Sequence, residues 1–148
     1  SSKQWGDDYN IIAPLPPLPA RATGRSAGYD VYSPENYILN PNEEIKFPTG
    51  FKVYMQDDEF LMIVPRSGLG FKYYLRLANT VGIIDSDYYN NKGNEGHCWV
   101  KIRNEGNKVL EIKFGEAVAQ AIFQKYLIAD DDDFVGKERV GGLGSTNT

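Results

Sequence analysis

Apolar positions along this chain occur in short runs, and most of these runs alternate with polar positions. A period of two is typical of β-strands that bury one face. Turns rich in asparagine, glycine and proline separate the runs, and the chain has 15 Gly and 8 Pro in 148 residues. We therefore predict an all-β domain, with strands over 29–32, 37–39, 44–47, 49–55, 60–64, 81–84, 97–103, 109–112 and 117–123.

Three segments depart from simple alternation. Residues 60–64 are apolar throughout, which predicts a central strand that Pro65 stops. Residues 71–77 fit either a short helix or an irregular connection. Residues 136–148 have no apolar periodicity and are rich in glycine, so we expect a mobile C-terminal arm after a folded domain over 1–135.

Composition describes one soluble globular domain, because the apolar fraction is 41% and the charged fraction 24%. No apolar run approaches membrane-spanning length and the first residues lack a signal-peptide pattern, so we expect no membrane association. The net charge of −4 and the lack of a basic stripe argue against nucleic-acid binding.

The chain has one cysteine and one histidine. Cys98 excludes an intramolecular disulfide and fits a reducing cytosol, which predicts a cytoplasmic location. Because Trp99 and Val100 follow it in a strand-like run, we expect a buried, inert thiol. His97 alone cannot build a histidine-rich metal site or a Ser-His-Asp triad, so hydrolysis would depend on carboxylates, a metal or both.

The segment 79–89 is the strongest candidate for a site. Its β-branched residues predict an extended segment in which Gly82 permits a bulge or the close approach of a ligand. Asp85 ends this strand in a polar turn, and Tyr88 follows. A carboxylate and an aromatic ring delivered to a turn suit a functional site. Taken alone, a hairpin with a polar tip and a packed tyrosine explains the segment better.

Other polar residues lie where phosphate groups could bind. Arg66, Ser67 and Gly68 directly follow the central strand, and a guanidinium, a hydroxyl and free backbone N–H groups together suit a phosphate. Gln120 interrupts an apolar strand, although an amide satisfied within the sheet explains it equally. Asp30 lies within a strand pattern, where a carboxylate either faces solvent or belongs to a charged site.

Five segments, in order, resemble the five motifs of the trimeric dUTPases, of bacterial or phage type. They are 26–30, 65–69, 79–88, 115–120, and Arg139 with 141–146. The resemblance implies a β-jelly roll and a homotrimer with three active sites shared between chains. It also implies that dUTP binds with Mg²⁺ and that water attacks the α-phosphorus, giving dUMP and pyrophosphate.

The resemblance implies a role for each matching residue. Asp85 corresponds to the carboxylate that activates water. Tyr88 corresponds to the ring under the deoxyribose, and Asn79 with the backbone of Gly82 and Ile84 corresponds to the uracil reader. Asp30 corresponds to the residue tied to the metal through water. The implied phosphate contacts are Arg66, Ser67, Gly68, Gln120, Arg139, Gly144, Ser145 and Thr146, and Leu143 stands where many members place an aromatic that stacks on uracil.

Two alternatives stay open at this point. A dCTP deaminase resembles the dUTPases in fold, although the spacing from Asp85 to Tyr88 and the glycine-rich tail favour a dUTPase. A jelly-roll protein that acts by binding a regulatory partner is the other alternative. Asp85 argues against a purely non-catalytic role and leaves an added protein partner, of unknown identity, open.

Overall fold

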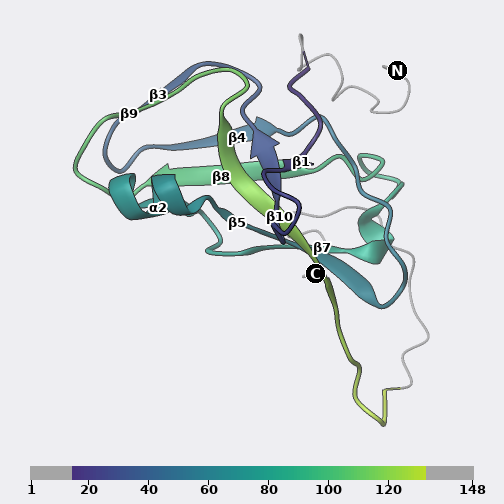
Figure 1. Cartoon of the computed structure of the whole chain (residues 1–148). Helices are drawn as coiled ribbons and strands as arrows, with labels where there is room; N and C mark the ends of the chain where they lie inside the picture. The colour runs from purple at the N-terminus through teal and green to yellow at the C-terminus, as the bar shows by residue number, and fades with distance from the viewer. Residues whose placement is uncertain (1–14, 133–148) are drawn as a thin grey trace.

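A computed structural model describes residues 15–132 of the chain (Figure 1). The strand predictions fall within this range, whereas the predicted arm at 136–148 lies outside it. Within this range, strands predominate over helices, which confirms the all-β prediction. No helix among the described residues is long and apolar enough to cross a membrane.

Ten strands, one short α-helix and one 3-10 turn make up the described chain. In chain order the strands are β1 (Ala20–Arg21), β2 (Tyr29–Tyr32), β3 (Tyr37–Leu39), β4 (Glu44–Pro48), β5 (Glu59–Pro65), β6 (Leu75–Leu77), β7 (Gly82–Asp85), β8 (Trp99–Asn104), β9 (Leu110–Ile112) and β10 (Ala117–Lys125). The helix α2 (Ser67–Tyr73) follows β5, and the turn η2 (Ser86–Tyr88) follows β7.

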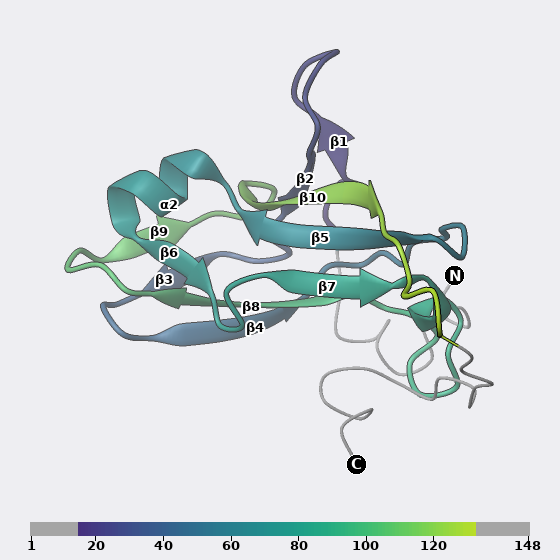
Figure 2. The ribbon, with the colours of Figure 1, turned by 90° about the horizontal axis from the view of Figure 1, so that it is seen from below.

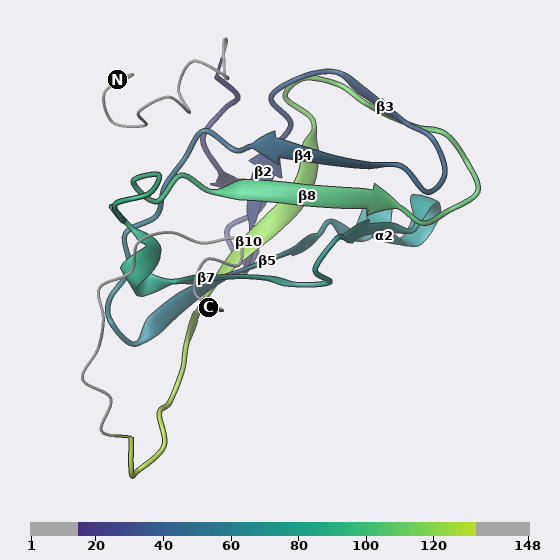
Figure 3. The same ribbon diagram turned by 180° about the vertical axis from the view of Figure 1, so that it is seen from behind.

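The strands form three sheets whose neighbouring strands are antiparallel. The largest has the order β1-β2-β10-β5-β7, the second is β4-β8-β6, and β3 pairs with β9. In Figure 3, β4 and β8 lie above β5 and β7, with β10 crossing between them, and Figure 2 shows the same two layers from below. Consecutive strands therefore often belong to different sheets, as in a jelly roll.

The core lies between these layers, and strand alternation selects its residues. In β8, Val100 and Ile102 face inward and are buried, whereas Lys101 between them is exposed. Leu61 and Ile63 of β5 enter the same cluster from the other layer. Burying one such side chain contributes about 1.5–3 kcal/mol to folding. The alternating pattern in the sequence therefore matches the two-layer packing.

The central position predicted for residues 60–64 is confirmed, because β5 pairs with β10 on one side and with β7 on the other. Pro65 is the last residue of that strand rather than the residue beyond it. Neither alternative predicted for residues 71–77 holds over the whole segment, because a helix covers its start and a strand covers its end. The helix α2 ends at Tyr73, and β6 begins after Tyr74, which adopts a left-handed conformation with φ of 54°.

The strand predicted over residues 49–55 is wrong. This segment forms no ladder, and Gly50 has a φ of 81°, which a regular strand does not accommodate. Its backbone bonds go to loop groups instead. The Gly50 N–H donates to His97 Nε2 at 3.0 Å, and the Thr49 N–H donates to the Cys98 carbonyl at 3.0 Å. Alternation still places Phe51 in the core.

Candidate active site

Asp30 and Gln120 lie side by side because of strand register. Asp30 of β2 pairs with Gln120 of β10, and Gln120 pairs with Val64 of β5. Directly opposed residues of antiparallel strands project from the same face of a sheet. The register therefore places a carboxylate and a carboxamide, separated by more than 80 positions in the sequence, next to each other on the outer face.

Gly28 makes room for the Gln120 side chain. A Cβ at position 28 would lie 2.3 Å from Gln120 Oε1 and 3.2 Å from its Cβ. Glycine at 28 thus allows the carboxamide to rest against the backbone just before β2. This packing is a physical reason for glycine at position 28.

Arg66 joins this group from the end of β5. Its Nε lies 3.7 Å from Asp30 Oδ1, and the Asp30 side chain is 18% exposed against 45% for Arg66. At this separation the attraction is coulombic rather than a hydrogen bond. Ser67 and Gly68 follow in the first turn of α2 and are exposed. A Cβ at Gly68 would meet open space, so packing within the described chain does not require glycine there.

The second group of predicted residues lies on β7 and η2. Asp85 ends β7 opposite Phe60, is exposed, and directly precedes η2. The strand β7 is the edge of the five-stranded sheet, so one side of its backbone faces outward. Ile84 packs against the core. An added Cβ at Gly82 would lie 3.2 Å from the Ile63 Cβ, which is a tight contact.

Asn79 lies in the connection that carries the chain from one layer to the other. It is exposed, and its carbonyl accepts a hydrogen bond from Val81 N–H at 2.7 Å. The next residue, Thr80, has a φ of 68°, and its N–H donates to the Leu77 carbonyl at 3.0 Å. The connection is therefore a tight turn that presents Asn79 at the start of β7.

Tyr88 is held largely within the core and is 6% exposed. Its hydroxyl donates to the His97 carbonyl at 2.9 Å and accepts a hydrogen bond from Asn94 Nδ2 at 2.8 Å. A ligand could therefore touch only a small, firmly held part of this side chain. Asp85 and Tyr88 belong to one short unit, as the sequence predicts.

Two side chains of the loop over residues 90–96 also belong to this unit, and neither is predicted as a site residue from the sequence. Asn91 is 5% exposed, and its Nδ2 donates to the Tyr88 carbonyl at 2.7 Å. Asn94 contacts the Tyr88 hydroxyl. The signal was present in the spacing Asn91-x-x-Asn94-x-Gly96, because asparagine side chains commonly bond to backbone groups two or three residues ahead.

The two groups lie far apart within one chain. Asp85 pairs with Phe60 at the start of β5, whereas Arg66 follows the end of the same strand. Six strand residues at about 3.3 Å each place these backbones about 20 Å apart. Side chains cannot close that gap, so one described chain does not bring Asp85 to Asp30, Arg66 and Gln120.

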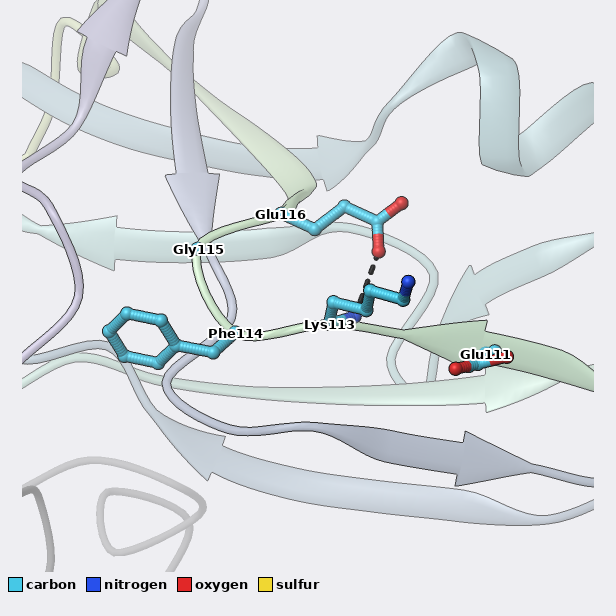
Figure 4. Close-up of a pocket in the computed structure, with 5 residues that line it drawn as sticks. All are labelled: Glu111, Lys113, Phe114, Gly115 and Glu116. Atoms are coloured by element: carbon cyan, nitrogen blue, oxygen red, sulfur yellow. Dashed lines mark hydrogen bonds between the residues drawn. The ribbon is translucent and has the colours of Figure 1, made fainter.

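Three further features of the described chain bear on its chemistry. Among residues 15–132, no three His, Cys, Asp or Glu side chains gather into a metal-binding group. Cys98 is buried as predicted, and burial raises the pKa of its thiol to about 12; its lack of reactivity stays a prediction. An open hollow between β9 and β10 contains none of the predicted site residues; it is lined by Glu111, Lys113, Phe114, Gly115 and Glu116 (Figure 4).

Comparison with known proteins gives consistent results. The dUTPase family model matches residues 16–146. The deoxyuridine 5'-triphosphate nucleotidohydrolase of Lactococcus lactis subsp. lactis is 45% identical over 130 residues, which cover 87% of each chain. The protein of the same name from Hahella chejuensis is 39% identical over 140 residues, covering 89% of this chain and 88% of that protein.

Solved structures show the same fold. The crystal structure of dUTPase from Streptococcus mutans has a TM-score of 0.70 at 38% identity, covering 80% of this chain and 95% of that one. A phage phi11 dUTPase of S. aureus has a TM-score of 0.67 at 19% identity, covering 87% and 96%. That structure describes the coordination of a structural Mg(II) ion in the phage protein, and at this identity the likeness concerns the fold alone.

Proposed function

This chain belongs to the dUTPase family, and on that premise we propose that it hydrolyses dUTP to dUMP and pyrophosphate by attack of water at the α-phosphorus. The observation that carries the proposal is the family match over 16–146, within which strand register groups Asp30, Arg66 and Gln120. The alternatives of a deaminase and of a purely regulatory protein are not favoured, because the curated relatives are named as hydrolases of deoxyuridine triphosphate.

The first group of residues binds the triphosphate. Arg66 supplies a positive charge, while Ser67 and Gln120 supply polar groups that can donate hydrogen bonds to phosphate oxygens. Gly68 leaves open space in front of its backbone, where a phosphate can approach. Hydrolysis of a polyanion depends mainly on such positioning and charge neutralisation.

The second group binds the nucleoside and prepares the water. Asn79 and the outward-facing backbone of β7 at Gly82 and Ile84 read the uracil edge. Tyr88 lies under the deoxyribose and leaves no space for a 2′-hydroxyl. Asp85 orients the attacking water and accepts its proton as the oxygen bonds to the α-phosphorus, while pyrophosphate leaves.

Mg²⁺ fits this site as a companion of the substrate. The ion usually binds one or two carboxylates together with substrate phosphates and keeps several waters, so it does not need the cluster of three protein ligands that residues 15–132 lack. Asp30 would hold it through a water molecule. When bound, Mg²⁺ neutralises part of the triphosphate charge. Removal of divalent metal with a chelator should abolish activity, and added Mg²⁺ should restore it.

The separation of about 20 Å between Asp85 and Arg66 supports a homotrimer with active sites shared between chains. In this arrangement one chain supplies Asp85 and Tyr88, and a neighbouring chain supplies Asp30, Arg66 and Gln120. The arm residues Arg139, Leu143, Gly144, Ser145 and Thr146 lie outside the described residues, and we propose that they complete the site over the nucleotide.

Subunit mixing tests the shared site. Chains carrying Asp85→Asn and chains carrying Arg66→Ala should each be almost inactive alone. After unfolding and refolding together in equal amounts, about a quarter of the sites should combine an intact Asp85 with an intact Arg66 from another chain. Inactive mixtures, or an active monomer by light scattering, would contradict the shared site.

Pyrophosphate release across a nucleotide panel tests the reaction itself. We expect rapid release from dUTP and slow release from UTP, dCTP and dTTP, with no ammonia from dCTP. Ammonia release would identify a deaminase. If no nucleotide yields pyrophosphate or ammonia, a binding role with a partner protein would be favoured. We also propose a cytoplasmic location, because Cys98 is kept as a free thiol and the substrate is a nucleotide.

A further inference from the structure

The loop over residues 90–96 has no role in the steps proposed above, yet the side chains of Asn91 and Asn94 form a hydrogen-bond network in it. Asn91 Oδ1 accepts from the N–H groups of Gly93 at 2.8 Å and Asn94 at 3.0 Å. Its Nδ2 donates to the Tyr88 carbonyl at 2.7 Å and to Asn94 Oδ1 at 2.9 Å. Both polar atoms of this amide therefore make two hydrogen bonds each.

Asn94 uses its amide in the same way, and one of its bonds reaches Tyr88. Its Oδ1 accepts from Asn91 Nδ2 and from Gly96 N–H at 3.1 Å. Its Nδ2 donates to the Tyr88 hydroxyl at 2.8 Å and to the His97 carbonyl at 3.3 Å. Since Gly96 N–H can only donate and the His97 carbonyl can only accept, these partners define the orientation of the amide.

The orientation of the Asn94 amide also fixes the direction of the two hydrogen bonds at the Tyr88 hydroxyl. The hydroxyl receives a hydrogen bond from Asn94 and donates its own proton to the His97 carbonyl at 2.9 Å. Two partners at fixed positions hold the far end of the ring, while the backbone of η2 holds the near end. The ring cannot tilt without breaking one of these bonds.

The backbone of the loop also lies against the turn that carries Tyr88. Gly96 has a φ of 90°, and a Cβ there would come within 2.9 Å of the Tyr88 carbonyl oxygen and of the Asn90 nitrogen. A side chain at position 96 would push the loop away from η2. The loop and η2 are therefore one closely packed unit.

We propose that Asn94 is a positioning residue for substrate selection: it anchors the Tyr88 hydroxyl and so prevents the ring from yielding to a ribose. This inference rests on the proposed function, in which Tyr88 excludes the 2′-hydroxyl of UTP. A ring that can tilt makes space for that hydroxyl, whereas a ring held by two hydrogen bonds does not. Loss of the anchor should therefore favour UTP more than it harms dUTP.

Asn94→Asp tests this, because it keeps the shape of the side chain and removes the donor to Tyr88. The measurement is kcat/KM for dUTP divided by kcat/KM for UTP, and loss of one hydrogen bond should lower this ratio about tenfold. Tyr88→Phe should lower it comparably, since it removes the anchored hydroxyl. In the Tyr88→Phe background, Asn94→Asp should lower the ratio no further.

Asn104 provides a matched control. It is fully buried at the end of β8, and its Nδ2 donates to the carbonyls of Leu39 at 2.9 Å and Lys108 at 2.8 Å. Asn104→Asp should lower the melting temperature and leave the selectivity ratio unchanged. Comparison of Asn94→Asp with Asn104→Asp thus separates an effect on stability from an effect on the selectivity ratio.

The outcomes distinguish the two proposals. A wild-type chain that releases no pyrophosphate from dUTP refutes the proposed function. A wild-type chain that hydrolyses dUTP selectively, while Asn94→Asp lowers only the melting temperature, refutes the positioning role. If Asn94→Asp does not fold, Tyr88→Phe decides, because unchanged selectivity in that variant shows that the anchored hydroxyl is not needed.

Discussion

The two halves of the proposed site are held by different kinds of structure. The phosphate half is the group that contains Asp30, Arg66 and Gln120. It depends on strand register, because Asp30 and Gln120 are paired residues of β2 and β10. The sugar half comprises Asp85, the turn η2 that carries Tyr88, and the loop over 90–96. It depends on side chains, because the amides of Asn91 and Asn94 join this loop to the turn that carries Tyr88. Backbone ladders tolerate many substitutions, whereas an amide network loses its geometry when one member changes.

This contrast predicts different responses to mutation. In the phosphate half, single substitutions should act only where a side chain contacts the substrate or disturbs Gln120. In the sugar half, residues that never touch the substrate should also alter selectivity. The predictions below test this difference, starting with the largest expected effect.

Asp85→Asn should reduce turnover by about 10²–10⁴-fold, because the amide keeps the shape of the side chain and cannot accept the proton of water. Binding of dUTP, measured by calorimetry, should remain close to that of the wild type. Asp87→Asn serves as the control, since Asp87 is exposed in the same 3-10 turn. Near wild-type turnover in Asp85→Asn would assign the base to another carboxylate.

Cys98 reports whether the sugar half is as closed as the network implies. Burial raises the pKa of its thiol from 9.0 to about 12, so the reactive thiolate at pH 8 should be about a thousandfold scarcer in the folded protein than in the unfolded chain. Alkylation by iodoacetamide, followed by mass spectrometry, should therefore be slow until denaturant is added.

Gly96→Ala sharpens this test, because an added methyl group collides with the backbone at Tyr88 and the Cys98 Sγ lies 3.6 Å from the Gly96 carbonyl. Loosening the loop should expose the thiol and speed its alkylation. Gly24→Ala is the control, since a Cβ at 24 meets nothing within 4 Å. Equal alkylation rates in all three chains would show that the network does not close this region.

Gly28→Ala should impair the phosphate half. The new Cβ would lie 2.3 Å from Gln120 Oε1, so the carboxamide must leave its place beside Asp30. We expect kcat/KM for dUTP to fall about tenfold, which corresponds to the loss of one hydrogen bond to the substrate. The selectivity ratio against UTP should not change, and Gly24→Ala should match the wild type. A fall in that ratio would break the separation between the two halves.

The sequence predicts the phosphate half better than the sugar half. The apolar run at 60–64 identifies a central strand, and the polar residues that interrupt neighbouring strands, Asp30 and Gln120, prove to be neighbours in the sheet. Alternation fails at 49–55, where Gly50 and bonds to the loop near His97 replace a ladder. Contacts such as Asn94 to Tyr88 depend on the path of a loop, which periodicity does not describe.

The resemblance to trimeric dUTPases implies sites shared between chains, but sequence patterns alone do not give the distance between Asp85 and Arg66. The motifs at 65–69 and 79–88 are close in the chain, but α2 and β6 intervene before β7 turns back along β5. Only the register of β5 with β7 shows that Asp85 lies at the opposite end of the strand. The proposal that a second chain completes the site therefore rests on the topology of the described residues.

The last expected effect concerns stability at alkaline pH rather than activity. Burial and the nearby Glu35 carboxylate raise the pKa of Tyr37 from 10.0 to about 12, and burial raises that of Cys98 similarly. Both groups stay protonated in the folded state after they ionise in the unfolded state. Their contribution to stability is thus complete below about pH 9 and lost as the pH rises towards 12.

Melting temperatures recorded between neutral and alkaline pH should therefore decline above pH 9, and Tyr37→Phe and Cys98→Ala should each flatten part of the decline. Tyr37 lies in β3, outside both halves of the site, whereas Cys98 lies beside the loop of the sugar half. If the two regions are independent, the effects of the two substitutions should add in the double variant. Clear non-additivity would mean that the sugar half is coupled to the distant strand pair β3–β9, and the comparison between two separately held halves would then fail.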